Sequence, residues 1–237
     1  LVQSECTFRV SGKQPELWDA LSVERRAAAA FRQSKGRTTL PLEFAPYGSL
    51  FVVFQKPIAT DATGRAARNF PTYSTPFEIA GDWEASFDPK WGGPASAKFE
   101  RLVSWTRRPE PGIKHYSGKA TYQKTFDLPE ALRSRGQPLV LELGTVKNIA
   151  AVRLNGKDLG VVWTHPWRVE ITEAVREAGN RLEIEVVNLW PNRLIGDAAL
   201  PPEKRLTRGN VQLGKDHPLL ESGLLGPVTL RAVALPK

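Results

Sequence analysis

The sequence predicts an all-β protein made of two sandwich-like units, and three observations support this prediction. Short apolar runs recur along the 237 residues, with Gly, Pro and Asn between them. Helical patterns are few and short. An Asn-Gly pair at positions 155–156 stands between two apolar runs, which is a strong sequence signal of a tight hairpin.

The first predicted unit covers residues 1–57. Its four β-like runs are LVQSECTFRV, PELWDAL, RTTLPLEF and SLFVVFQ. Between the second and third runs, Ser22–Arg32 contains four consecutive alanines that fit a helical turn, but it lacks a helical stripe and fits a β-meander equally well. The single cysteine, Cys6, is expected as a small hydrophobe of the first strand.

Residues 58–76 are predicted to form a linker. Small, polar and basic side chains dominate this segment, which has prolines at positions 71 and 76. Its length exceeds that of a common loop, so we expect it to cross the surface between two units.

The second predicted unit covers residues 77–237. FEIAGDWEASFD and ATYQKTFDLP alternate apolar and polar residues, and PLVLELGTV reads as a central strand. RVEITEAVREAG, NRLEIEVVNLW and GPVTLRAVAL continue the series, with short helical patterns at Glu130–Arg135 and Glu173–Glu177. Many short antiparallel strands with few helices favour a β-sandwich of jelly-roll type.

The hairpin around positions 155–156 predicts where two tryptophans point. A two-residue turn places Val152 opposite Leu159, and continuing by twos puts Trp163 on the same apolar face. Trp167 shares a face with the apolar residues 169 and 171 of the next strand. We therefore expect both tryptophans in the core rather than in a sugar-stacking platform. His165, just before a proline, is expected at the surface.

The charge pattern argues against two classes of partner. The net charge of +8 divides into +4 for residues 1–75 and +4 for the remainder, and the longest basic cluster is a pair. Nucleic-acid-binding proteins usually concentrate basic residues on one face, so no nucleic-acid partner is expected. No apolar run approaches the roughly 20 residues of a membrane span, so no membrane partner is expected either.

Motifs for catalysis, metals and phosphates are missing from the sequence. It has no Gly-x-Ser-x-Gly element, its three histidines are far apart, and no His or Cys spacing fits a zinc site. Glu142, Glu170, Glu183 and Glu185 alternate along strands, as residues on a solvated sheet face do. We expect no cofactor, and a structural calcium in a sandwich loop remains an alternative.

Carbohydrate binding is the direct activity that the composition favours. Tryptophan and tyrosine faces suit the C–H faces of sugars, whereas Asn, Arg and His suit their hydroxyl groups. The candidate contacts outside regular strands, with His165 among them, are Trp91, His115, Tyr116, His165, Trp190, Asn192 and Arg193. For Trp91 and Trp190 the alternative is packing at the edge of a sandwich. Trp83 and Trp105 lie among alternating residues and are expected in the core.

Three motifs in order identify a family resemblance. Y-x-G-x-x-x-Y-x-K-x-F lies at 116–126, L-N-G-K-x-L-G at 154–160 and N-R-L-I-G-D at 192–197. Over roughly 77–233 the chain resembles the sugar-binding β-sandwich of family 2 glycoside hydrolases. It is still more similar to the accessory region of family 106 α-L-rhamnosidases. FRVSGKQPELWDAL and APYGSLFVVF resemble the small sandwich segment that precedes this module.

The resemblance implies a galactose-binding-like jelly roll at 77–237, preceded by a smaller, incomplete β-sandwich. It implies a non-catalytic fragment of a secreted or periplasmic glycoside hydrolase whose acid and base lie on a separate (β/α)₈ barrel. The expected partners are that catalytic domain and a plant or microbial polysaccharide containing rhamnose or galactose. Two alternatives are a purely structural scaffold docked on the barrel and a self-contained glycosidase.

Overall fold

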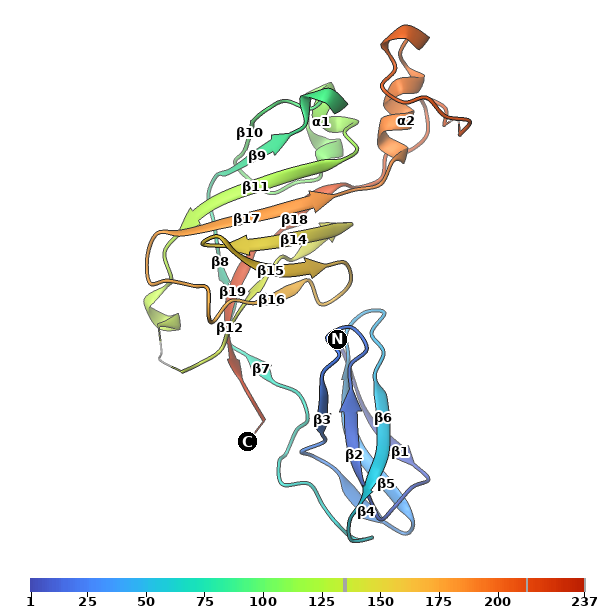
Figure 1. Ribbon diagram of the computed structural model, residues 1–237, viewed down its shortest axis with the longest axis vertical. Coiled ribbons are helices and arrows are strands. Elements are labelled where there is room, and N and C mark those ends of the chain that lie inside the picture. The colour runs from blue at the N-terminus through green and yellow to red at the C-terminus, as the bar shows by residue number, and fades with distance from the viewer. Residues whose placement is uncertain (134–135, 212, 237) are drawn as a thin grey trace. The chain divides into compact units, whose positions relative to one another are not determined.

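The structure, a computed structural model, describes residues 1–133, 136–211 and 213–236 (Figure 1). Strands dominate it and the helices are short, which confirms the all-β prediction. The chain divides into two compact units. The first contains Leu1–Ser74 together with the C-terminal residues from Val233 onward, and the second contains Thr75–Ala232.

The first unit consists mainly of two antiparallel three-stranded sheets. In sheet order, the strands are β1 (Val2–Phe8), β5 (Arg37–Phe44) and β4 (Arg32–Ser34), then β3 (Arg25–Ala27), β2 (Lys13–Trp18) and β6 (Phe51–Pro57). Leu17, Leu40 and Leu42 are buried in its core. The alanine-rich stretch contributes the end of β3 and connects it to β4, so it forms no helical turn. Because β3 and β4 belong to different sheets, it is a strand connection without the neighbouring pairing of a meander.

Most of the segment expected as a linker packs against the first unit. The buried Asn69 side chain accepts a hydrogen bond from Ala30 N at 2.7 Å and donates to Ala30 O at 2.7 Å and Pro41 O at 3.0 Å. A Cβ at Gly64 would lie 2.3 Å from Ala29 O, so only glycine permits this approach. A short strand, β7 (Thr72–Tyr73), then pairs with Val233 and Ala234.

The second unit is a sandwich whose larger sheet has six strands (Figure 1). In sheet order these are β10 (Ala97–Phe99), β9 (Trp83–Phe87), β11 (Lys119–Phe126), β17 (Asn180–Val187), β14 (Ile149–Leu154) and β15 (Lys157–Val162). The other strands are β16 (Arg168–Glu170), β12 (Leu139–Glu142), β19 (Thr229–Ala234) and β8 (Phe77–Glu78), with the pair β13 (Thr145–Lys147) and β18 (Gly223–Gly226).

The core of the second unit forms because alternate strand residues point inward. Trp83 and Trp105 are both buried, as expected. The Tyr122 hydroxyl accepts a hydrogen bond from Trp105 Nε1 at 2.6 Å, so the polar atoms of both aromatic side chains are satisfied inside the core. Burial raises the pKa of Tyr122, although the hydrogen bond from Trp105 opposes this shift.

Within the described part of the chain, helices and 3₁₀ turns occur only in connections of the second unit. They are η1 (Pro89–Trp91), η2 (Trp105–Arg107), α1 (Pro111–Lys114), η3 (Glu130–Leu132), α2 (Pro191–Ala198) and η4 (Pro202–Lys204). The helix expected at 130–135 is only the turn η3, and its last two positions lie outside the described residues. The helix expected at 173–177 is wrong, because this stretch forms turns in which Ala174 N donates to Ile171 O.

The β14–β15 hairpin contains a bulge that the simple two-residue count did not predict. Asn155 and Gly156 have φ of 55° and 83°, as a type I′ turn requires. Beyond Arg153↔Asp158 the register shifts by one residue, so that Ala151 faces Val161. Gly160, with φ of 91°, takes up the extra residue.

The bulge reverses the predicted direction of Trp163. A one-residue shift moves every following side chain to the other face of the sheet. Val162 therefore packs against the core and Trp163 is 60% exposed, so the predicted core position of Trp163 is wrong. Trp167 lies beyond the strand end and is partly buried against the core, as expected.

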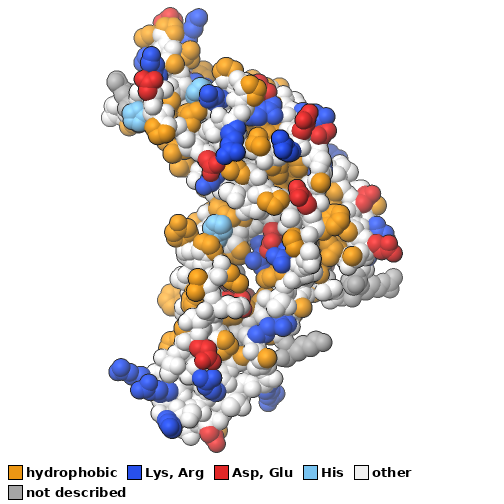
Figure 2. Space-filling view, turned by 180° about the vertical axis from the view of Figure 1, so that it is seen from behind, with side chains coloured by type: hydrophobic (Ala, Val, Ile, Leu, Met, Phe, Trp, Pro, Cys, Tyr) orange, Lys and Arg blue, Asp and Glu red, His pale blue; other side chains and the backbone are white. Residues whose placement is uncertain are grey.

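Charges on the surface are mixed. On the face seen in Figure 2, Lys and Arg side chains are interspersed with Asp and Glu. Across the described ranges, no helix is long and apolar enough to cross a bilayer.

Candidate functional site

Trp91 and Trp190 are brought together at one end of the six-stranded sheet. Trp91 ends the turn η1, which Asp88 caps by accepting a hydrogen bond from Lys90 N at 2.9 Å. Trp190 immediately precedes α2. The two rings meet edge to face with centroids 5.5 Å apart, and they are 37% and 55% exposed. Two indoles in this arrangement offer a corner of apolar surface to solvent.

This corner opens onto a pocket of about 340 Å³, which we call the tryptophan pocket. Its volume lies within the range of small-molecule sites, roughly 300–1,000 Å³. Its lining residues are Asp88, Trp91, Tyr116, Ser117, Gly118, Lys119, Val187, Asn188 and Trp190. Three of the sequence-predicted contacts, Trp91, Tyr116 and Trp190, therefore share one site.

Tyr116 forms part of the base of the pocket and is fully buried. Its hydroxyl accepts from Asp88 N at 3.1 Å and donates to Lys119 O at 2.8 Å. Burial raises the pKa of Tyr116, which keeps the hydroxyl protonated and able to donate. The ring packs edge to face against Phe87 and Trp105, so Tyr116 supports the site and is not a stacking face for a sugar.

Asn188 fixes the same base through three hydrogen bonds. Its amide nitrogen donates to Tyr116 O at 2.9 Å and to Ser222 Oγ at 3.0 Å, while its oxygen accepts from Gly118 N at 2.9 Å. The sequence reasoning missed this residue. The only available signal was its place at the end of an alternating strand, and many surface asparagines share that signal.

Ser117 links the base to α2. Its hydroxyl donates to Leu189 O at 2.8 Å and accepts from Arg193 N at 3.2 Å. Leu189 and Arg193 flank Trp190 in the sequence, so these two hydrogen bonds restrict the position of the Trp190 backbone. The polar base and the exposed indole are therefore joined in one hydrogen-bonded structure.

Asn192 and Arg193 are buried inside the fold, whereas the sequence prediction placed them at a sugar-binding surface. They are 1% and 6% exposed. Asn192 donates to Leu220 O at 2.7 Å and Ser222 Oγ at 2.9 Å, and it accepts from Leu220 N at 2.8 Å. The motif N-R-L-I-G-D thus anchors α2 and the segment that follows it.

Arg193 forms an ion pair with Asp197 one helical turn further on, with 2.9 Å between Nη2 and Oδ1. Asp197 Oδ2 accepts hydrogen bonds from Thr207 N at 2.7 Å and Thr207 Oγ1 at 2.6 Å. Burial alone would raise the pKa of Asp197, but the bonds from Thr207 and the charge of Arg193 outweigh burial and lower it. The charged carboxylate therefore ties the segment after α2 to the helix.

The two histidine candidates lie outside the tryptophan pocket. His115 is partly buried against α2. The approach is close, because a Cβ added to Gly196 would lie only 2.6 Å from the Cβ of His115. Burial lowers the pKa of His115, and the charges of Arg193 and Lys114 add to this effect. His165 lies in the β15–β16 connection with its ring 5.7 Å from that of Trp167. Neither lines the pocket with Trp91 and Trp190.

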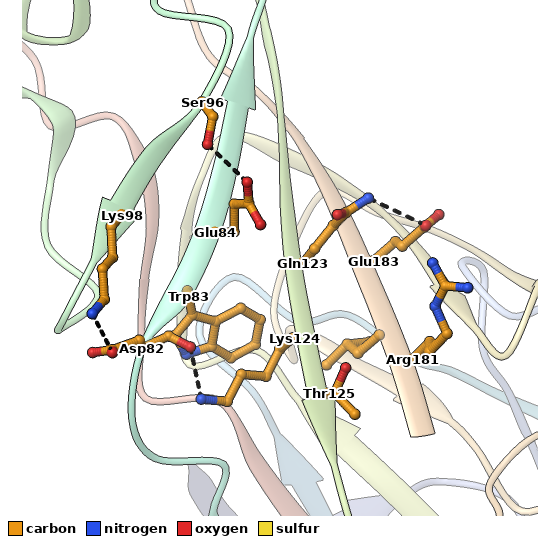
Figure 3. A pocket seen from close by; sticks show the side chains of 11 residues that line it. Asp82, Trp83, Glu84, Ser96, Lys98, Gln123, Lys124, Thr125, Arg181 and Glu183 are labelled. Carbon is orange, nitrogen blue, oxygen red and sulfur yellow. Dashed lines mark hydrogen bonds and ion pairs between the residues drawn. The ribbon is translucent and has the colours of Figure 1, made fainter. Parts of the chain in front are cut away.

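A second depression of about 580 Å³ lies on the outer face of the same sheet; we call it the polar groove (Figure 3). Its lining residues are Asp82, Trp83, Glu84, Ser96, Lys98, Gln123, Lys124, Thr125, Arg181, Leu182 and Glu183. Ser96 donates to Glu84 at 2.8 Å and Lys98 pairs with Asp82 at 2.6 Å. The sequence predicted Glu183 on a solvated sheet face. It could not show that residues on the adjacent strands form a groove around this side chain.

No metal centre is evident in the ranges that the structure describes, since they hold no group of three His, Cys, Asp or Glu side chains able to bind an ion. Asp82 pairs with a lysine and Asp88 caps a turn. Both carboxylates therefore have local roles within the fold.

Residues 110–210 match the family model described as glycosyl hydrolase 2 galactose-binding domain-like. The chain is 37% identical over 182 residues to a Formosa agariphila protein named "Putative beta-glucuronidase", covering 67% of this chain and 16% of that protein. It also matches a rhamnosidase structure from Novosphingobium sp. PP1Y, with a TM-score of 0.81 and 38% identity. This second match covers 96% of the chain and 21% of the rhamnosidase, so the chain spans a minor part of both proteins.

Proposed function

We propose that this chain, which carries a glycoside hydrolase 2 galactose-binding-like domain at residues 110–210, is a carbohydrate-binding accessory part of a larger glycoside hydrolase. The observation that carries the proposal is the exposed corner formed by Trp91 and Trp190 over a hydrogen-bonded base. The similarity to a rhamnosidase, of which the chain spans 21%, supports an accessory role.

The tryptophan pocket suits a sugar in two ways. The exposed indole of Trp190 can pack against the C–H face of a pyranose ring. This contact buries apolar surface of both rings and leaves the sugar hydroxyl groups accessible at the ring edge. Asp88 can accept hydrogen bonds from those hydroxyls and Lys119 can donate to them. Because Trp91 stands at the edge of Trp190, the corner best fits a single ring.

The proposed ligands are plant or microbial polysaccharides that contain rhamnose or galactose. A secreted or periplasmic parent enzyme would meet such polymers outside the cytosol. Binding by this part of the chain would hold the polymer near a catalytic domain and raise the local substrate concentration.

Cleavage of the glycosidic bond is assigned to another part of the parent protein, on a (β/α)₈ barrel. Most glycosidases use two carboxyl groups separated by about 5–10 Å. Among the described residues that line the tryptophan pocket, Asp88 is the one carboxylate. The pocket thus has chemistry for holding a sugar and lacks the second carboxyl group for hydrolysis.

The direct test is titration calorimetry of the chain with L-rhamnose, D-galactose and pectic oligosaccharides, together with gel retardation in the corresponding polysaccharides. We expect saturable binding at millimolar sugar for at least one of them. Absence of heat and of retardation with all of these ligands would refute carbohydrate binding. Hydrolysis of aryl rhamnosides by the chain alone would refute the non-catalytic role.

A structural scaffold is the second candidate, and the first unit favours it. Its β1 strand lies at the edge of a three-stranded sheet. The pairings Val2↔Phe44 and Trp18↔Phe51 bring the start of β1, the 19–24 loop and the 45–50 loop to one end. The large apolar side chains exposed at this end are Leu1, Val2, Leu21, Val23, Tyr47 and Phe51. An apolar end of this kind is suited to docking on another domain.

The scaffold role predicts that the isolated chain binds a hydrophobic dye and self-associates. Both effects should weaken when Tyr47 and Phe51 are changed to serine. A monodisperse monomer that binds no dye would count against docking through this end and would leave the sugar-binding proposal as the better explanation.

A further inference from the structure

The tryptophan pocket and the polar groove lie on the same two strands. β11 and β17 are antiparallel neighbours, and alternate residues on each point to the outer face of the sheet. The four outward pairs along them are Lys119↔Val187, Thr121↔Glu185, Gln123↔Glu183 and Thr125↔Arg181. The first pair lines the tryptophan pocket, and the last two line the polar groove.

These pairs form a continuous row between the two depressions. From Lys119 to Thr125 the strand advances roughly 20 Å, at about 3.3 Å per residue. The intervening pair, Thr121 and Glu185, is polar, and Lys119 Nζ bridges to Glu185 Oε1 at 3.0 Å. The inward residues Ala120 and Tyr122 are buried, which fixes the direction of the outward row.

The polar groove has the chemistry of a hydroxyl-binding surface (Figure 3). Its lining carries three acidic and three basic side chains, so it does not select strongly for an ion of either sign. Trp83 is buried at its floor and offers no stacking face to solvent. Ligands would therefore be held there mainly by hydrogen bonds.

Four side chains on β11 and β17 form a compact array within this groove. Gln123 donates to Glu183 through a long hydrogen bond of 3.4 Å, so this contact is weak and open to replacement. Thr125 and Arg181 occupy the next pair along the strands (Figure 3). Donors and acceptors thus alternate over two neighbouring strands, an arrangement that matches a molecule with hydroxyl groups along its edge.

We propose that the outer row of β11 and β17 binds a neutral oligosaccharide chain, with one sugar stacked in the tryptophan pocket and the following sugars reaching to the polar groove. This glycan track rests on the proposed carbohydrate function and extends it from a single ring to a chain of several. It predicts that affinity rises with ligand length until the chain reaches Gln123 and Arg181.

The test measures dissociation constants for D-galactose, L-rhamnose and neutral, galactose-containing oligosaccharides fractionated by length. Wild type is compared with the double variant Gln123→Ala/Arg181→Ala. Lys157→Ala serves as a control because Lys157 is an exposed cation in the same domain that lines neither depression. We expect the wild-type protein to bind the longest fraction at least tenfold more tightly than the monosaccharide.

The double variant should lose most of this tenfold gain, whereas Lys157→Ala should keep it. Equal affinity for short and long ligands, or an unchanged gain in the double variant, would overturn the track while leaving the tryptophan pocket in place. Failure of every ligand to bind would overturn the carbohydrate function and the track together. Circular dichroism and urea unfolding confirm that each variant is folded before its binding is compared.

Discussion

Trp91 and Trp190 meet edge to face, with 5.5 Å between their ring centroids, although one ends a 3₁₀ turn after β9 and the other precedes α2. Both positions are irregular connections that the six-stranded sheet brings to one end. The apolar corner they form is held by the buried bonds of Tyr116 and Asn188 beneath it.

Changing Trp190 to alanine should weaken sugar binding at least tenfold, equivalent to about 1.4 kcal/mol. The reason is loss of the larger exposed face of the corner. Trp163→Ala is the matched control, since Trp163 is 60% exposed but lies in the β15–β16 connection. Calorimetric titration checks both variants. Equal losses in the two would show that exposed indoles bind sugars nonspecifically.

Replacement of Asn192 by alanine should destabilise the second unit by about 1–3 kcal/mol, because the buried Ser222 hydroxyl and the Leu220 peptide groups lose their hydrogen-bond partner. Asn210→Ala is the control, since Asn210 is exposed. Urea denaturation followed by tryptophan fluorescence gives the free energy of unfolding. A neutral Asn192→Ala variant would contradict the anchoring role assigned to this side chain.

Asp197→Asn should lower the stability at neutral pH by about 3 kcal/mol, because the substitution leaves the charge of Arg193 buried without its partner. The pKa of the folded-state carboxyl lies below its ordinary value of 3.8. The stabilisation is therefore fully present above pH 3.8 and is lost as the pH falls through the lower folded-state pKa.

The measurement is urea unfolding of wild type and variant at several pH values. The difference between them should stay constant near neutral pH and shrink in acid. The exposed Asp216, changed to asparagine, should show no such difference. A gap that widens in acid would contradict the ionised Asp197 and its bonds to Thr207.

Substituting Gly160 with alanine should destabilise the hairpin by about 1–2 kcal/mol, because its φ of 91° is strained for any residue with a Cβ. Space is not the cause, since no atom lies within 4 Å of an added Cβ. Gly209→Ala is matched to it, with equally open space and a backbone outside the left-handed region. Equal thermal midpoints for the two variants would show that the bulge tolerates a side chain.

The amino-acid sequence by itself determined the class of fold, because the two-residue alternation of apolar side chains is a local property. It also determined the hairpin turn, since Asn155 and Gly156 both adopt the positive φ they favour. The core position of Trp83, in β9, follows from the same alternation, whereas Trp105 is buried at the start of the 3₁₀ turn η2 and alternation does not account for it. These features depend on backbone geometry within a few residues.

Only the tertiary structure decided which candidates share a site. A single extra residue at Gly160 reversed Trp163, and strand alternation cannot reveal such a shift. Asn192 and Arg193 anchor a helix, but their polar character alone did not distinguish them from residues that face solvent. Their burial depends on contacts with segments distant in the chain, such as those of Leu220 and Thr207. The tryptophan pocket exists because strand pairing brings Trp91 and Trp190 to the same end of one sheet.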